Sequence, residues 1–200
     1  IGVFAWQYTV QCVNSGLHSV TGNVNLVKKV AVPRFILPLA STTANTVNYL
    51  LSLLVQFPLL WFLQREAGGL SGWSLAFPVV LAVHFCFNLA LAMFMAASNV
   101  YFRDTEHLVN VGLSAFFFMS PVMYNLDFVA HMSESHPWLP DLYVLNPVAV
   151  LITGYRVLFL GEGAFPWSPW SVAAIALCPV LLAAAYLVFK RAQRNFADYL

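Results

Sequence analysis

Five histidines, three cysteines and eight acidic residues are the side chains best able to bind a metal or move a proton, but their spacing predicts no catalytic site. No two histidines stand four residues apart with a glutamate between them, the arrangement by which a helix holds zinc in a metalloprotease. The sequence also lacks a glycine-rich phosphate loop and a Gly-x-Ser-x-Gly turn for a serine nucleophile. We therefore expect no catalytic residue, no cofactor and no metal in this chain, so any ATP that drives it must bind to another chain.

The three cysteines and one of the histidines can be explained as structural residues. Cys12, Cys86 and Cys178 lie far apart in apolar stretches, so we expect them to be packing residues. His84 stands in the middle of an apolar run, where a hydrogen-bonded core histidine is expected. The alternative is a functional group, because ionisable residues inside membranes are often functional.

The overall composition indicates the class of protein in which these residues stand. Of the 200 residues, 60% are hydrophobic and only 8% are charged. A soluble domain is about 45–50% apolar and about 25% charged. So few charges cannot keep the surface of a soluble protein of this size hydrated, and we predict an all-α membrane protein. The formal net charge of +1 argues against a nucleic-acid partner, which calls for clustered positive charge.

Long uncharged runs divide the chain into five predicted transmembrane helices within a single domain over 1–200. Each run is close to or above the length of about 20 residues that crosses a hydrocarbon core of about 30 Å. The predicted spans are 3–20, 35–63, 73–102, 108–126 and 172–189.

The basic residues predict the orientation of these spans. Alternation places the loops 28–34 and 103–107 and the tail after residue 189 on one side of the membrane, and this side holds seven of the nine Lys and Arg residues. Cytoplasmic loops carry the excess of Lys and Arg, so this side is predicted to be cytoplasmic. The first residue is then outside, which suits a chain that has lost an upstream span.

The outer segment 127–170 is expected to hold short helices that do not cross the membrane. Asn146 precedes Pro147 as an N-cap precedes a proline at the first helical position, and Gly161 is a stop signal. The predicted helix, Pro147–Leu160, would be about 21 Å long at 1.5 Å per residue, which is too short to cross. We expect it to lie in the outer leaflet or at the mouth of a pore.

The cytoplasmic segment 22–34 reads GNVNLVKKVAVPR, which predicts a short amphipathic helix between a capping asparagine and a proline stop. One interpretation is purely topological, because positive charge holds any such loop inside. The other is a rigid helix that docks into the groove of a soluble partner.

Further motifs follow this loop in order along the chain. They are SNVYFRDTEH at 98–107, FFMSPVMY at 117–124, LNP at 145–147, GYRVLFLG at 154–161 and FKRAQRNFAD at 189–198. Together with GNVNLVKKVAVPRFILPL at 22–39 they resemble the type-2 ABC transporter permeases, most closely those that export O-antigen, capsular polysaccharide or teichoic acid. The resemblance covers essentially the whole chain. Family members have an interface helix and a first span upstream, so it implies an N-terminal truncation.

The resemblance implies roles for two groups of residues. In this family the loop after the second span contacts the nucleotide-binding subunit, which implies coupling roles for Asn25, Lys28, Lys29 and Arg34. The outer segment resembles the family's gate helices, which implies that Asn146, Pro147, Tyr155 and Arg156 lie near the exit. For Arg156 the alternative is a snorkelling side chain that reaches lipid headgroups.

Polar and aromatic side chains within the spans are candidates to line a sugar path, since polar groups avoid lipid. For the aromatic ones, core or lipid packing is the alternative. The candidates are Asn45, Asn48, Tyr49, Gln56, Asn88, Phe117 and Tyr124. Ala92 and Ala96 form a small-xxx-small pair that predicts a close helix contact.

The function implied by the resemblance is the multi-pass membrane subunit of an ATP-driven exporter in the bacterial inner or plasma membrane. Two copies would form the pore, two copies of a separate ATPase subunit would bind ATP and Mg, and the cargo would be a lipid-linked polysaccharide. A type-2 exporter of drugs or small lipids is an alternative with the same fold. An intramembrane glycan-modifying enzyme is a further one, but Asp127, Glu134 and Asp141 are spread through one loop instead of forming a cluster.

Overall fold

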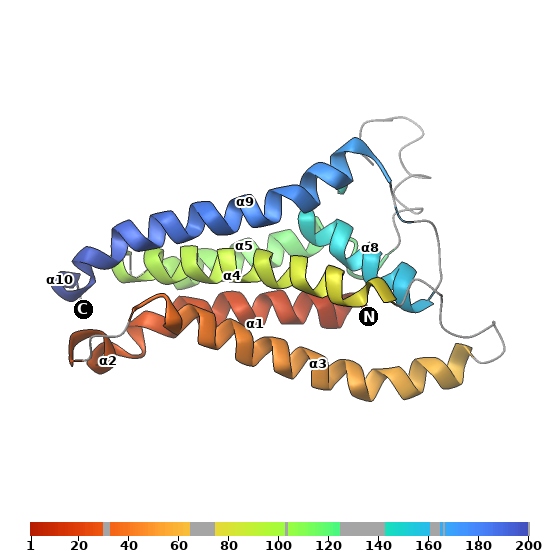
Figure 1. The fold of residues 1–200 in the computed structure, drawn as a ribbon, viewed down its shortest axis with the longest axis horizontal. Coiled ribbons are helices and arrows are strands. Elements are labelled where there is room, and N and C mark those ends of the chain that lie inside the picture. Colours follow the sequence, from red (N-terminus) through yellow and green to blue (C-terminus); the bar gives the residue numbers. More distant parts are fainter. Residues whose placement is uncertain are drawn as a thin grey trace.

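The computed structural model describes residues 1–29, 33–64, 75–102, 104–124, 143–160, 165 and 167–199, and every regular element among them is a helix. Four long helices run side by side and form the body of the molecule (Figure 1). They are α1 (Gly2–Thr21), α3 (Ile36–Gln64), α4 (Phe77–Tyr101) and α9 (Pro169–Ala192). Helix α4 is central, because it packs against the other three.

These four helices occupy four of the five predicted spans, with ends that differ by a few residues. Trp73, where the third span was expected to begin, lies outside the described residues. Among the described helices, α4 and the segment Pro169–Asn195 are the two whose length and apolar composition suffice to cross a membrane.

The fourth predicted span differs from the structure. A helix was expected over 108–126, but α5 begins at Thr105 and ends at Phe118, and turns follow it. The early end has a local cause: Pro121 has no backbone N–H to donate, and it disfavours helical geometry at the residue before it. Helix α5 is therefore only 14 residues long, or about 21 Å at 1.5 Å per residue.

Two helix starts agree with their sequence signals. Helix α8 runs from Pro147 to Leu160, and the side-chain oxygen of Asn146 accepts a hydrogen bond from the backbone N–H of Val148 at 3.0 Å. Helix α9 begins at Pro169 behind Ser168, whose side chain accepts from the N–H of Ser171. The predicted N-cap at Asn146 is thus confirmed. The predicted stop at Gly161 and the outer residues 127–142 lie outside the described part of the chain.

Helices α1 and α4 approach each other so closely that a side chain on one of them is excluded. A Cβ added to Gly16 would lie 2.6 Å from both the Cα and the Cβ of Ala92. Ala92 and Ala96 are fully buried, and the predicted close contact is confirmed for Ala92. Small residues of this kind let helix backbones approach closely.

The two ends of the bundle carry different elements (Figure 1). Helix α2 (Val24–Lys29), helix α10 (Phe196–Tyr199) and the C-terminus lie at one end, while the N-terminus and α8 lie at the other. Helix α10 also contacts α2. This arrangement agrees with the prediction that the loop 22–34 and the C-terminal tail share one side.

Candidate functional site

Helix α2 turns one side toward the bundle and the other toward solvent. Val27 is only 5% exposed and belongs to a buried apolar cluster, whereas Asn25, Leu26 and Lys28 are exposed. Two of the four residues expected to contact a partner, Asn25 and Lys28, therefore lie on the outer surface of α2. The side chain of Lys29 lies outside the described part.

Arg34, the fourth of these residues, has an internal partner. Its Nη1 donates a hydrogen bond to the backbone carbonyl of Gln193, which directly follows α9. The C-terminal end of a helix carries partial negative charge, so a guanidinium is favoured there. Arg34 therefore ties the end of the loop to the end of α9, and direct contact with a partner protein stays a prediction for this residue.

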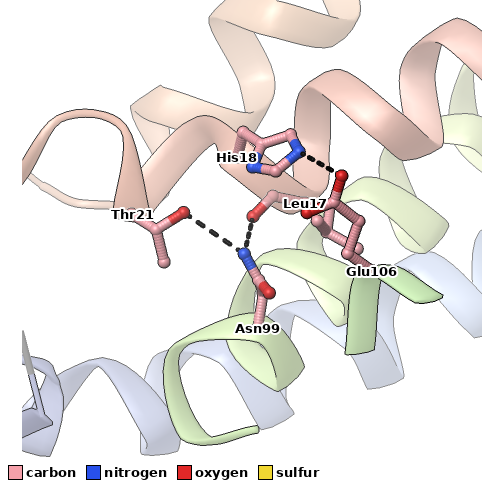
Figure 2. Close-up of polar contacts among 5 residues, drawn as sticks. All are labelled: Leu17, His18, Thr21, Asn99 and Glu106. Carbon is pink, nitrogen blue, oxygen red and sulfur yellow. Dashed lines mark hydrogen bonds and ion pairs between the residues drawn. The ribbon is translucent and has the colours of Figure 1, made fainter. Parts of the chain in front are cut away.

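Hydrogen bonds fix the end of α1, from which α2 continues, to the end of α4. Figure 2 shows Nδ2 of Asn99 donating to the carbonyl of Leu17 at 2.9 Å and to Oγ1 of Thr21 at 3.2 Å. The same view shows Nε2 of His18 lying 3.7 Å from Oε1 of Glu106 in α5. Both of these side chains are more than half exposed, so this ion pair contributes little. Asn99 is thus the main anchor here, and no sequence signal beyond its place in the SNVYFRDTEH motif marked it.

At the opposite end, Arg156 joins α8 to the chain that follows α5. Its Nη2 donates to the carbonyl of Val122 at 2.7 Å, and its Nη1 donates to the carbonyl of Tyr124. A second link comes from Asn146, whose Nδ2 donates to Oγ of Ser120 at 2.9 Å. Two of the four predicted gate residues therefore hold α8 against this segment, and Pro147 is its first helical residue.

We expect Arg156→Lys to lower the free energy of unfolding by about 1.5–3 kcal/mol, the value of hydrogen bonds to a charged group. A lysine ammonium is a point charge on a flexible stem and does not reproduce the fork that reaches two carbonyls at once. Unfolding of the purified chain in detergent measures this difference. Arg194→Lys, at an exposed position, is the matched control and should leave stability unchanged. Equal stability of both variants would mean that the carbonyl bonds do not hold α8.

Tyr155, the remaining gate candidate, is fully buried and takes part in a polar cluster inside the bundle. Nε2 of His84 lies 2.8 Å from Oγ1 of Thr9, and Nδ1 of His84 lies 3.3 Å from the hydroxyl of Tyr155. Thr9 already donates its hydroxyl hydrogen to the carbonyl of Ala5 at 3.5 Å. The two ring nitrogens of His84 therefore link Thr9 of α1 to Tyr155 of α8. This confirms His84 as a hydrogen-bonded core histidine that connects α1, α4 and α8.

Two of the predicted path residues, Tyr49 and Asn88, lie beside this cluster in the core of the chain. The Tyr49 ring stacks on that of Tyr8 with centroids 4.7 Å apart, and Asn88 is fully buried. Among the described residues, neither the Tyr49 hydroxyl nor the two polar atoms of the Asn88 amide have a hydrogen-bond partner. Buried polar groups without partners are uncommon in folded proteins, so these two side chains have unused hydrogen-bonding capacity inside the bundle.

The other predicted path residues of α3 have hydrogen-bond partners or face outward. Nδ2 of Asn45 donates to the carbonyl of Gln11 in α1 at 3.2 Å, and Nε2 of Gln56 donates to the carbonyl of Ser52 in its own helix at 3.1 Å. Asn48 is exposed. In this conformation these three residues do not converge with Tyr49 and Asn88 on one cavity.

The last two path candidates lie near the end of the bundle that carries the N-terminus and α8. The Phe117 ring packs against Trp6 of α1 with centroids 5.7 Å apart. The Tyr124 hydroxyl donates to the carbonyl of Phe118 and contacts the hydroxyl of Tyr143, each at 3.1 Å. Within the described ranges, no group of three or more His, Cys, Asp or Glu side chains is placed to hold a metal ion.

Comparison with known proteins matches the chain to one transporter family. The sequence model of the ABC-2 type transporter matches residues 2–160. The chain is 33% identical over 199 residues to the O-antigen export system permease protein RfbA of Myxococcus xanthus, covering 99% of this chain and 73% of the relative. It is 25% identical over 199 residues to a protein of the same name from Klebsiella pneumoniae, covering 100% of this chain and 73% of the relative. Both alignments therefore include α2, α8 and α9.

Proposed function

The chain belongs to the ABC-2 type transporter family, and we propose that it is the membrane subunit of an exporter of lipid-linked polysaccharide, with O-antigen as the favoured cargo. A permease of this family is a transporter subunit and not an enzyme. The cargo proposal is supported by relatives that carry O-antigen export in their names and align with nearly the whole chain. Capsular polysaccharide and teichoic acid are cargoes of the same chemical class.

The proposed topology has five spans in the inner membrane. At 1.5 Å per residue α1 and α3 are about 30 Å and about 44 Å long, so each is long enough to join α4 and α9 across the bilayer. The fourth span would combine α5 with the residues that follow it. Apolar side chains that are more than half exposed support a lipid setting, since a soluble monomer rarely exposes so many. They include Leu51, Leu54, Val55, Leu59, Leu108, Val111, Phe118, Val172, Val180 and Leu187.

Energy would come from a separate ATPase subunit that binds ATP and Mg, and two copies of this chain would form the pore with two copies of that subunit. The observation that carries this proposal is the outward placement of Asn25, Leu26 and Lys28 on α2. A short helix that presents mixed polar and apolar side chains at the end of a bundle suits docking into a groove. Closure of the ATPase pair would move α2 and, through the α1–α4 contact, rearrange the spans.

The buried polar residues would serve the cargo once the spans separate. Tyr49 and Asn88 have unused hydrogen-bonding capacity, and separation of α3 from the α1–α4 pair would expose it to sugar hydroxyls. Asn48 and Gln56 of α3 would extend this polar surface. The α8 residues Tyr155 and Arg156 would control the exit, because they fix α8 to the bundle in the conformation described here.

The coupling role is tested with the double variant Lys28→Glu and Lys29→Glu. Placing like charges against a complementary surface costs several kcal/mol, so we expect at least about a tenfold loss of co-purified ATPase subunit and loss of export. Lys190→Glu with Arg191→Glu is the matched control, since both are exposed in the last turn of α9 at the same end. Intact association and export in the α2 variant would refute the coupling role, and equal losses in both variants would mean that general charge attraction holds the subunit.

The cargo half of the proposal needs a separate measurement. A strain lacking the gene is complemented with the whole gene and that of its ATPase, and the surface glycans are analysed by gel and by mass spectrometry of the lipid-linked pool. Restoration of O-antigen at the surface is the expected result. Restoration of capsule or teichoic acid alone would change the cargo within the same class, and restoration of none would refute polysaccharide export.

A further inference from the structure

The described residues after α9, 193–199, fold back over the end of the bundle and contact α2 and α4. A short 3-10 turn, Gln193–Asn195, redirects the chain into α10. Phe196 at this bend is fully buried. Its ring packs edge-on against Phe189 with centroids 5.5 Å apart and against Tyr101 at 6.1 Å.

The same apolar cluster contains the inner side of α2. Val27 is buried in it together with Phe189, Phe196 and Val100, which come from α9, α10 and α4. Helix α2 has six residues, far below the about 12–15 residues at which an isolated helix becomes even marginal in water. The position of α2 must therefore be fixed by this packing, and α10 is one of the elements that contact it.

Two side chains hold the C-terminal segment in place from the other elements. The hydroxyl of Tyr101 donates to the carbonyl of Ala192, the last residue of α9, at 2.8 Å. Arg34 donates to the next carbonyl, that of Gln193. The carbonyl of Gln193 also accepts from the backbone N–H of Phe196, so these bonds join the end of α9 to α4, to the loop and to the bend at Phe196.

We propose that the segment 193–199 is a brace that fixes α2, with Phe196 as its positioning residue. The brace rests on the proposed function, because the position of α2 matters for export only where α2 docks to the ATPase subunit. Phe196 does not touch that partner in this scheme. It acts by holding Val27, which keeps Asn25 and Lys28 turned outward and makes a displacement of α2 reach α9 and α4 together.

The structural half of the proposal is tested without any partner protein. In an otherwise wild-type chain, the cysteine of Val27→Cys is buried and should react slowly with a polar maleimide. Mass spectrometry identifies which cysteine is labelled. Adding Phe196→Ala should raise its labelling rate at least about tenfold, since local opening exposes the site. Asn25→Cys is the matched control, because this position is exposed already and its rate should not change. Unchanged protection of Val27→Cys would overturn the brace.

The coupling half is measured in the complex with the ATPase subunit. Phe196→Ala should lower export per ATP hydrolysed by between about twofold and thirtyfold, the range found for residues that carry coupling without touching a ligand. Phe196→Leu, which keeps most of the side-chain volume, should restore both export and protection of Val27. Phe102→Ala removes an exposed aromatic at the same end and should change neither. If Phe196→Ala exposes the cysteine of Val27→Cys to the maleimide but the complex still exports normally per ATP, the proposal is also overturned.

Two further outcomes are decisive. If Phe196→Ala does not fold, Arg34→Gln removes the bond to Gln193 without leaving a cavity and should deprotect Val27→Cys to a smaller extent; retained protection in that variant would overturn the brace. If the wild-type chain binds no ATPase subunit, the proposed function fails, while the labelling result still decides whether the segment holds α2.

Discussion

Gly16→Ala is expected to destabilise the folded chain by about 1–3 kcal/mol, although alanine is the better helix former by about 1 kcal/mol. The added methyl would lie 2.6 Å from the Cα and the Cβ of Ala92. These two atoms cannot move away by a change of side-chain rotamer, as the end of a long side chain could. Helices α1 and α4 must therefore move apart along their contact. Gly16→Leu extends the same conflict and should abolish accumulation of folded protein. Both variants are checked by thermal unfolding in detergent and by the yield of monodisperse protein.

Gly112 offers a matched control on α5. A Cβ at Gly112 meets nothing within 4 Å among the described residues, so Gly112→Ala carries the same change in helix propensity without a clash. It should leave stability unchanged or raise it slightly. If Gly16→Ala proved as stable as Gly112→Ala, the close α1–α4 contact would not exist in the protein.

His84→Ala should cost about 3–5 kcal/mol, the second large effect. The substitution removes a fully buried ring and leaves the hydroxyls of Thr9 and Tyr155 without this partner. Cavity formation and unpaired buried polar groups are both costly. Thermal unfolding measures the loss. His107→Ala, at an exposed position on α5, removes the same side chain from solvent and should cost less than about 0.5 kcal/mol.

A double-mutant cycle then separates the hydrogen bond from the packing of the ring. Tyr155→Phe keeps the aromatic ring and removes only the hydroxyl that contacts Nδ1 of His84. We expect a coupling energy between the two positions of about 0.5–3 kcal/mol, the range for residues in contact. Strict additivity of the two substitutions would contradict the hydrogen bond between α4 and α8.

Helix ends could be predicted where the sequence carries a local signal. Asn146 with Pro147 located the start of α8, and the polar and charged clusters located the ends of α1 and α3 to within a few residues. The fourth span was predicted too long, because the apolar run continues past Phe118 and hydropathy alone does not register the effect of Pro121.

Contacts between helices were not predictable in the same way. Helix α4 is apolar nearly all round, so its pattern marks no preferred face, and nothing in its sequence indicates that His84 meets Thr9 and Tyr155. The partner of Arg34 lies 159 residues further along the chain, and only the fold brings them together. The short helix α2, by contrast, was predicted from a local amphipathic pattern, while the coupling roles of Asn25 and Lys28 were implied by the family resemblance.

The contact between Gly16 and Ala92 also determines how a displacement at one end of the bundle is transmitted to the other. Two helices whose backbones touch slide past each other poorly, because interiors packed at this density transmit strain instead of absorbing it. Helix α2 follows α1 after a two-residue turn, and Asn99 pins the end of α1 to α4. A push on α2 therefore acts on α1 and α4 as a single stiff lever about 30 Å long, so a small tilt at the end that carries α2 becomes a larger sweep at the opposite end.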